Sequence, residues 1–264
     1  MTIWYSAYLL GNDKGWGRGM RWYAAFVTLF CACLTASGSF AQSCPAPMQN
    51  ASRLVLVTVP TLASSAGQLQ LFERPRAEAD WRLVRSAEPV NVGRKGVAWS
   101  RAFRHLAGND EPVKSEGDDR SPAGIYRLGR PFGFAASALA NYLQIDSDSV
   151  CVEDPSSPAY NKFASRQAVG LSVSKETMRA TPLYRRGLFV DYPTDASHKA
   201  GSCIFFHVWK KPGSGTAGCV TMPENRVALL QAFANRHATV VAILPESALG
   251  RLAGCLPPTV IGTR

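Results

Sequence analysis

The chain has 264 residues and a formal net charge of +10, with 29 Lys and Arg against 19 Asp and Glu. It contains no run of five basic residues and no recognisable nucleic-acid-binding motif, so we predict no nucleic-acid partner. A basic chain of this kind suits an anionic cell wall or membrane surface, and a generic solubilising charge is the alternative.

The N-terminal segment has the order of a secretory signal peptide. Residues 22–36 form an uncharged apolar run, with two arginines just upstream and Ser-Phe-Ala at 39–41. The alternative is a transmembrane anchor, but the run is shorter than the roughly 20 residues that a membrane-spanning helix needs. We therefore expect residues 1–41 to be cleaved, with Met20 as a possible true start. The mature protein would reach the periplasm or cell envelope with no membrane span left.

Strand patterns dominate the remaining chain after an irregular lead-in at residues 42–50. Short apolar or alternating runs bounded by turn residues predict strands at 53–60, 67–75, 81–86, 141–146, 188–192, 203–209 and 238–245. Residues 121–133 combine a Pro-x-Gly turn with a short strand. These elements predict one mainly β domain over residues 51–256, with a sandwich-like or barrel-like mixed sheet and a few short helices.

The clearest helix signal begins after residue 222. Thr221 and Glu224 have the spacing of a capping box, Pro223 suits a first turn, and apolar residues then recur at helical spacing to about Arg236. Weaker helix signals cover residues 101–106 and 131–139.

Five cysteines remain once Cys31 and Cys33 leave with the leader: Cys44, Cys151, Cys203, Cys219 and Cys255. An odd number means that at least one thiol stays free or pairs with another chain. Cys44 and Cys255 lie near the two mature ends, which are often close in space, and Cys151 and Cys203 each lie at or beside a predicted strand. We expect those two disulfides and a free Cys219, although spacing alone leaves other pairings open.

A histidine and a cysteine flank one short Gly-rich loop. His207 ends a strand pattern, and the loop that follows ends in Gly218 and Cys219. Cysteine attacks as the thiolate, which a nearby base generates, so this spacing suits acyl transfer through a thioester. Gly218 would leave room for substrate, and the Cys219 amide and its neighbours would face a developing oxyanion. A buried structural cysteine beside a core histidine is the alternative. A metal site is disfavoured because paired Cys-x-x-Cys or His-x-x-x-His ligands are absent, so we predict no metal.

Three ordered segments between residues 90 and 222 resemble the L,D-transpeptidase (YkuD-type) catalytic domain. His207, a spacer, and Thr216-x-Gly218-Cys219 match the family's active-site segment. Ser121, Pro122 and Gly124 match its Ser/Thr-Pro-x-Gly hairpin, and the segment from Cys151, "CVEDPSSPAYNKF", resembles small exported members. The chain departs from the family at Ala217, where many members have a second histidine, and at Thr221, where many have Arg or Asn.

The resemblance implies a YkuD-like fold and a reaction on peptidoglycan stem peptides without a cofactor. His207 would deprotonate Cys219, and an amine from a second stem would resolve the acyl-enzyme into a cross-link. If water were the acceptor instead, the protein would be a carboxypeptidase or endopeptidase. If the site were degenerate, the protein would be a wall-binding module without catalytic activity.

Further positions are candidates for contacts with the substrate. Loop amides of residues 216–218 and Val220 would hold the oxyanion, and Trp209 would wall the pocket. Arg120 would bind a stem carboxylate, with a solvated charge as the alternative. Asn161 would bind the substrate backbone, with a turn-forming role as the alternative.

Overall fold

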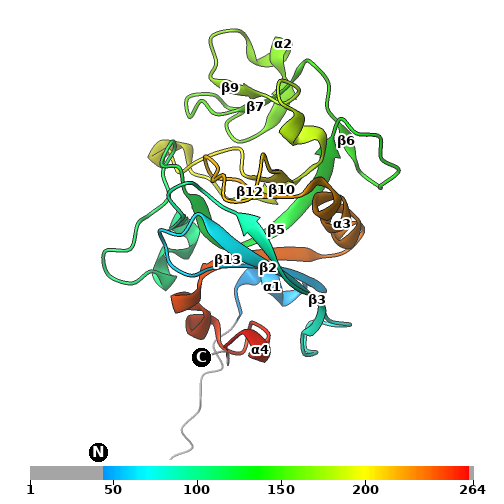
Figure 1. Cartoon of the computed structure of the whole chain (residues 1–264). Helices are drawn as coiled ribbons and strands as arrows, with labels where there is room; N and C mark the ends of the chain where they lie inside the picture. Colours follow the sequence, from blue (N-terminus) through cyan, green and yellow to red (C-terminus); the bar gives the residue numbers. More distant parts are fainter. Residues whose placement is uncertain (1–43, 262–264) are drawn as a thin grey trace, which may run out of the picture. The chain divides into compact units, whose positions relative to one another are not determined.

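The computed structural model describes residues 44–261, which form a mainly β structure with a few short helices, as the sequence predicted (Figure 1). The expected leader at residues 1–41 lies outside this range. Among the described residues, no helix combines the length and the apolar character needed to cross a bilayer.

The strands are β1 (Arg53–Val59), β2 (Ala66–Glu73), β3 (Arg82–Asn91), β4 (Val97–Trp99), β5 (Ser121–Gly133), β6 (Leu143–Gln144), β7 (Ser149–Val152), β8 (Phe163–Ser165), β9 (Lys175–Thr177), β10 (Gly187–Asp191), β11 (Phe205–Val208), β12 (Val220–Met222) and β13 (Thr239–Pro245). The α-helices are α1 (Ala46–Gln49), α2 (Arg166–Val169), α3 (Glu224–Ala234) and α4 (Pro258–Ile261), and the 3-10 helices are η1 (Arg101–Leu106), η2 (Pro182–Arg185), η3 (Ala196–His198) and η4 (Glu246–Leu252).

Eight strands form a closed mixed barrel. Their order is β10-β11-β12-β3-β2-β1-β13-β5, and β5 pairs back onto β10 to close the ring. Strands β4 and β6 pair with β5 outside the ring. The pairs β1–β13 and β11–β12 are parallel, and the other pairs of the ring are antiparallel. Closure leaves these strands without a free edge.

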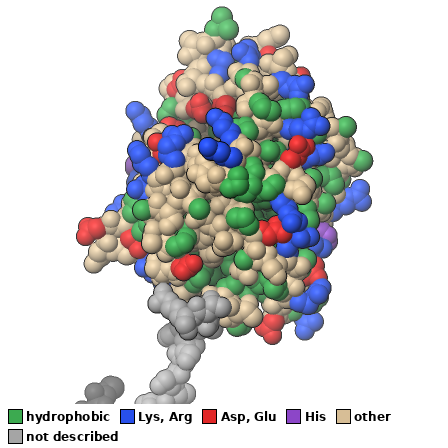
Figure 2. Space-filling view, in the orientation of Figure 1, with side chains coloured by type: hydrophobic (Ala, Val, Ile, Leu, Met, Phe, Trp, Pro, Cys, Tyr) green, Lys and Arg blue, Asp and Glu red, His purple; other side chains and the backbone are tan. Residues whose placement is uncertain are grey.

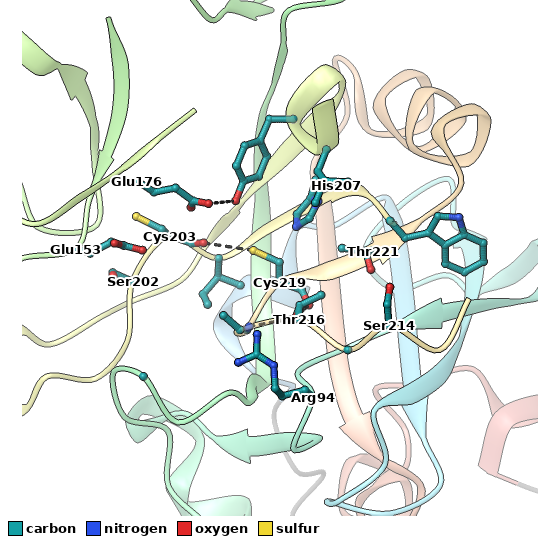
Figure 3. Close-up of a pocket in the computed structure, with 18 of the residues that line it drawn as sticks. Arg94, Glu153, Glu176, Ser202, Cys203, His207, Ser214, Thr216, Cys219 and Thr221 are labelled. Carbon is teal, nitrogen blue, oxygen red and sulfur yellow. Dashed lines mark hydrogen bonds between the residues drawn. The ribbon is translucent and has the colours of Figure 1, made fainter. Parts of the chain in front are cut away.

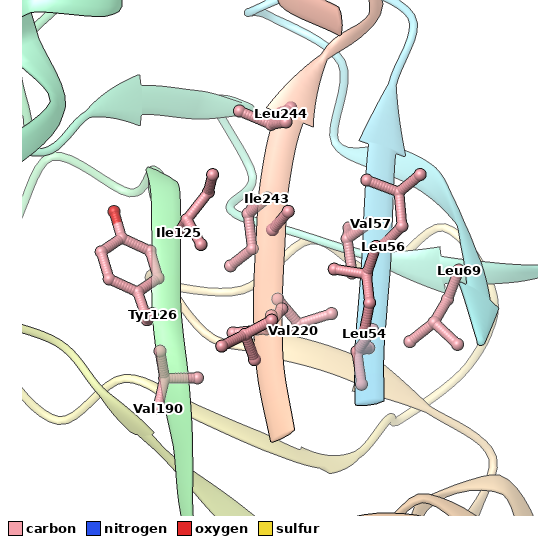
Figure 4. Packing of buried hydrophobic residues seen from close by; sticks show 14 of the residues in the cluster. Leu54, Leu56, Val57, Leu69, Ile125, Tyr126, Val190, Val220, Ile243 and Leu244 are labelled. Atoms are coloured by element: carbon pink, nitrogen blue, oxygen red, sulfur yellow. The ribbon is translucent and has the colours of Figure 1, made fainter. Parts of the chain in front are cut away.

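The core of the barrel lies around β13, which is buried at all seven positions between β1 and β5. Its sequence, TVVAILP, is nearly continuously apolar, as expected for a strand covered on both faces. Figure 4 shows Leu56, Ile125, Val220 and Ile243 within this buried cluster.

The helix predicted after residue 222 is present as α3, which packs against β10 and β11. Val227, Leu230 and Phe233 are its buried apolar residues. The predicted capping box does not form, because Pro223 is the N-cap and Thr221 lies in β12.

Other local predictions need correction. Residues 121–133 form one long strand, β5, instead of a turn and a short strand. The helix expected at 131–139 is absent because residues 131 and 132 continue β5 and pair with β10. Residues 101–106 form the 3-10 helix η1, and the lead-in contains the short helix α1.

A small second sheet, which we call the cap sheet, consists of β8, β7 and β9 (Figure 1). Beneath it lies a second apolar cluster: Phe132, Ile145, Cys151, Met178, Tyr184, Cys203, Phe205 and Cys219. Cys219 therefore belongs to the cluster between the cap sheet and the barrel.

Two disulfides join distant segments, and they are the pairs suggested by the sequence. Cys44–Cys255 spans 211 residues, and Cys151–Cys203 spans 52 residues. The second bond ties β7 of the cap sheet to the segment before β11. Among the described residues, Cys219 is the free cysteine, and it is buried.

Candidate active site

Strand pairing brings Cys219 and His207 to one face of the sheet. In the parallel pair of β11 and β12, His207 is opposite Thr221, and Cys219 precedes Thr221 by two residues. Side chains two apart on a strand share a face, so His207, Cys219 and Thr221 face the same way. All three line one cavity of about 490 Å³. Figure 3 shows the imidazole beside the thiol in this cavity.

The loop before Cys219 is fixed by its own hydrogen bonds. Thr216 Oγ1 accepts from Gly218 N (3.1 Å) and donates to Cys219 O (2.6 Å). Ser121 Oγ also donates to Cys219 O (3.2 Å). A Cβ at Gly218 would lie 3.1 Å from Ile204 Cδ1, so glycine allows close packing behind the thiol. This adds a packing role to the substrate access expected from the sequence.

The same loop is attached to β3 and to the segment after it. Thr216 N donates to Val92 O (2.9 Å), and Arg94 N donates to Thr216 O (2.8 Å). Asn91 binds the loop twice, because its Nδ2 donates to Lys211 O (3.0 Å) and its Oδ1 accepts from Gly213 N (2.9 Å). The Gly-rich loop is therefore held in place by hydrogen bonds to its backbone from β3 and from the segment that follows β3.

The Cys219 thiol is neutral in this resting arrangement. Burial raises the pKa of the thiol well above its usual range, and the nearby Glu176 carboxylate raises it further. Its Sγ donates to the carbonyl of Cys203 at 3.4 Å. The thiol proton is therefore directed at that carbonyl.

His207 is a neutral imidazole whose tautomer is set by its own strand. Its Nδ1 lies 2.8 Å from Val208 O, and a carbonyl can only accept, so Nδ1 carries the proton. Nε2 is then left with a free lone pair. Burial lowers the pKa of His207 to about 4. The Tyr184 ring packs edge-on against the imidazole at a centroid distance of 4.9 Å.

One side of the cavity is acidic. Glu153, Glu176 and Glu116 line it, and Tyr184 donates its hydroxyl to Glu176 (2.6 Å). Burial, with the charges of Glu176 and Glu116, raises the pKa of Glu153 to about 7. The buried Lys114 ammonium, also in this wall, is paired with Asp118 at 2.6 Å. This side of the cavity therefore favours a positively charged group.

These acidic residues and Tyr184 were not among the site residues expected from the sequence. Glu153 directly follows β7, Glu176 is the middle residue of β9, and Tyr184 comes from η2. No local spacing connects these positions with His207 or Cys219. The available signal was the resemblance of the segment from Cys151 to small exported members, which includes Glu153.

Four of the tentative positions line the cavity: Trp209, Thr216, Ala217 and Gly218. Val220 does not, because the alternation along β12 turns it into the barrel core, where it is fully buried.

Arg120 and Asn161 also lie outside the set that lines this cavity. The Arg120 guanidinium donates to the carbonyls of Leu62 and Val97. The Asn161 side chain accepts from Cys203 N (2.8 Å) and donates to Tyr192 O (3.1 Å). Both polar side chains are thus engaged with backbone groups and do not line this cavity.

Comparisons with known proteins gave few matches. No family model matches the chain, and no curated protein matches it. Two solved structures of the helical cell shape determining protein Pgp2 from Campylobacter jejuni, one of them a point mutant, are 16% identical with TM-scores of 0.37 and 0.36. The alignments cover 74% of this chain and 48% and 47% of those chains, so the match spans about half of their length.

Proposed function

We propose that the protein is an exported L,D-transpeptidase of peptidoglycan, with Cys219 as nucleophile and His207 as general base. The observation that carries this proposal is the free thiol beside a neutral imidazole whose Nε2 lone pair is unused, both in one cavity. A buried structural cysteine would need neither the cavity nor that tautomer.

The first half of the reaction forms a thioester. His207 Nε2 takes the proton of Cys219 Sγ as the sulfur attacks the carbonyl carbon of a donor stem peptide. The C–N bond then breaks, and the leaving amine takes that proton from the imidazolium. Because the resting thiol is neutral, proton transfer accompanies the attack instead of preceding it.

Of the loop amides at 216–218, the N–H of Ala217 would hold the oxyanion, because Thr216 N donates to Val92 O and Gly218 N donates to Thr216 Oγ1. Ala217 lines the cavity, and its N–H has no acceptor within residues 44–261. A donor that points at the developing charge lowers the barrier by several kcal/mol, typically about 3.

The acidic wall supports a donor stem that carries an ammonium group, as a diaminopimelate-type centre does. The carboxylates of Glu153 and Glu176 raise the pKa of Cys219 when no cation is bound. A bound ammonium would offset that charge and make the thiolate easier to form. Substrate binding would thereby activate its own nucleophile.

Two disulfides fit a protein that folds in an oxidising compartment, which supports export to the cell envelope. Lys and Arg side chains are spread over the face seen in Figure 2 and mixed with Asp and Glu. On this face, the mixture favours general attraction to an anionic wall over one dedicated binding patch.

The test is the analysis of products from purified sacculi incubated with the protein and with Cys219→Ser. We expect cross-linked muropeptide dimers that depend on Cys219. Shortened monomers without dimers would make the protein a hydrolase that uses the same thiol. Identical products from both proteins, with the variant still folded by circular dichroism, would refute the catalytic proposal and favour a wall-binding module.

A further inference from the structure

Thr221 lines the cavity and carries a buried hydroxyl without a hydrogen-bond partner among the described residues. Three buried side-chain polar atoms among the described residues have no hydrogen-bond partner: Ser100 Oγ, Thr221 Oγ1 and Gln231 Oε1. Of these three residues, only Thr221 lines the cavity that contains Cys219 and His207. Thr221 is 2% exposed, so bulk water does not compensate for the missing partner.

The position of Thr221 relates it to the imidazole. It is opposite His207 in the β11–β12 register, and it follows Cys219 by two residues on the same face. Figure 3 shows Cys219 and Thr221 on opposite sides of the imidazole, with the hydroxyls of Thr221 and Ser214 directed toward each other. Ser214 Oγ donates its own proton to Lys211 O (2.8 Å) and retains lone pairs that accept.

A buried hydroxyl without a partner costs free energy, and a valine would fill the same space without that cost. An N–H or O–H group of a ligand that donated to Thr221 Oγ1 would remove that cost. Such a ligand could donate hydrogen bonds to two atoms, Thr221 Oγ1 and the Nε2 of His207.

We propose that Thr221 binds the attacking group of the second half-reaction, which is the acceptor amine or water. This inference rests on the proposed function. The attacking amine or water donates one hydrogen to His207 Nε2 and another to Thr221 Oγ1. Its lone pair then faces the thioester. The new C–N or C–O bond forms as the C–S bond breaks. The acceptor proton passes to Nε2 and then to Cys219 Sγ, which restores the neutral pair.

The test separates the two half-reactions in Thr221→Val, with Thr221→Ser as the matched control that keeps the hydroxyl. Each protein is mixed with a disaccharide-tetrapeptide muropeptide, and the acyl-enzyme is followed by intact-protein mass spectrometry. Its decay is measured in buffer and with added glycinamide as a primary amine. Alkylation of Cys219 by iodoacetamide and the melting temperature check that the pocket and fold are intact.

We expect Thr221→Val to form the acyl-enzyme at close to the rate of the unmodified protein and to lose it about tenfold more slowly, the usual effect of one hydrogen bond. Thr221→Ser should restore the decay. Equal decay rates in Thr221→Val and the unmodified protein would overturn the role of Thr221, as would equal slowing of both steps. Absence of any Cys219 acyl-enzyme in the unmodified protein would instead overturn the proposed function.

Discussion

The disulfide between Cys151 and Cys203 should contribute strongly to stability. It closes a loop across 52 residues of sequence. Chain entropy of such a loop corresponds to about 4 kcal/mol of unfolding free energy. Replacing both cysteines by alanine should therefore lower the melting temperature by roughly 10 °C in a domain of this size. Differential scanning calorimetry under non-reducing conditions measures this change.

The same bond should also matter for reactivity, because the cavity has walls from both the cap sheet and the barrel. Glu153 and Glu176 come from the cap-sheet side, while His207 lies on the barrel strand β11. The carbonyl of Cys203 is the acceptor of the Cys219 thiol. Loosening this segment should therefore slow the acylation of Cys219.

The second disulfide provides the matched control. Cys44–Cys255 closes a longer loop, across 211 residues, and lies outside the cavity, so its removal should cost about 5 kcal/mol without slowing acylation. The expected role of the Cys151–Cys203 bond is refuted if the Cys151→Ala/Cys203→Ala protein melts within about 2 °C of the unmodified protein. It is also refuted if both double variants acylate equally fast.

Three further changes test the electrostatics of the cavity. Burial lowers the pKa of His207 to about 4, so stability should fall as pH drops from 6.5 through 4, by up to about 3 kcal/mol. Urea unfolding at pH 7 and at pH 4.5 should show this loss of stability in the unmodified protein and not in His207→Gln. Equal losses in the two proteins would contradict this prediction. The pKa of Glu153 is raised to about 7, so its charged form destabilises the fold increasingly as pH rises from 4.5 to 7. Allowing for solvent screening, Glu153→Gln should raise the free energy of unfolding by about 1 kcal/mol at pH 8 and leave it unchanged at pH 4.5. Thermal melts at both pH values measure this difference. Tyr184→Phe leaves the Glu176 carboxylate without its donor and should cost about 1–3 kcal/mol in urea unfolding, and a loss below about 0.5 kcal/mol would count against it.

Local sequence patterns predicted much of the barrel and the pairing of His207 with Cys219 in one cavity. Alternating and continuous apolar runs predicted β1, β2, β11 and β13, because the pattern of burial is a direct consequence of strand geometry. The short loop between the imidazole and the thiol limited how far apart they could lie. The alternation along β12 was also enough to assign the Val220 side chain to the core, whereas the role expected at the oxyanion concerned its backbone amide.

Other parts depended on contacts between segments distant in sequence. The long strand β5 and the missing helix at 131–139 reflect pairing with β10 and β13, which overrides local turn signals. Arg120 and Asn161 were candidates because they are polar and lie in the resembling segments, but backbone carbonyls and amides engage their side chains. The acidic side of the cavity, formed by Glu116, Glu153 and Glu176, depends on how the cap sheet packs against the barrel. No local sequence pattern predicts that packing.

The most direct test of the central claim is covalent labelling of the purified protein with a carbapenem, read by intact-protein and peptide mass spectrometry. We expect one equivalent of adduct on Cys219, none in Cys219→Ser, and a labelling rate at least about a hundredfold lower in His207→Gln. An adduct that persists in Cys219→Ser, or the absence of any adduct on the folded protein, would contradict the central claim.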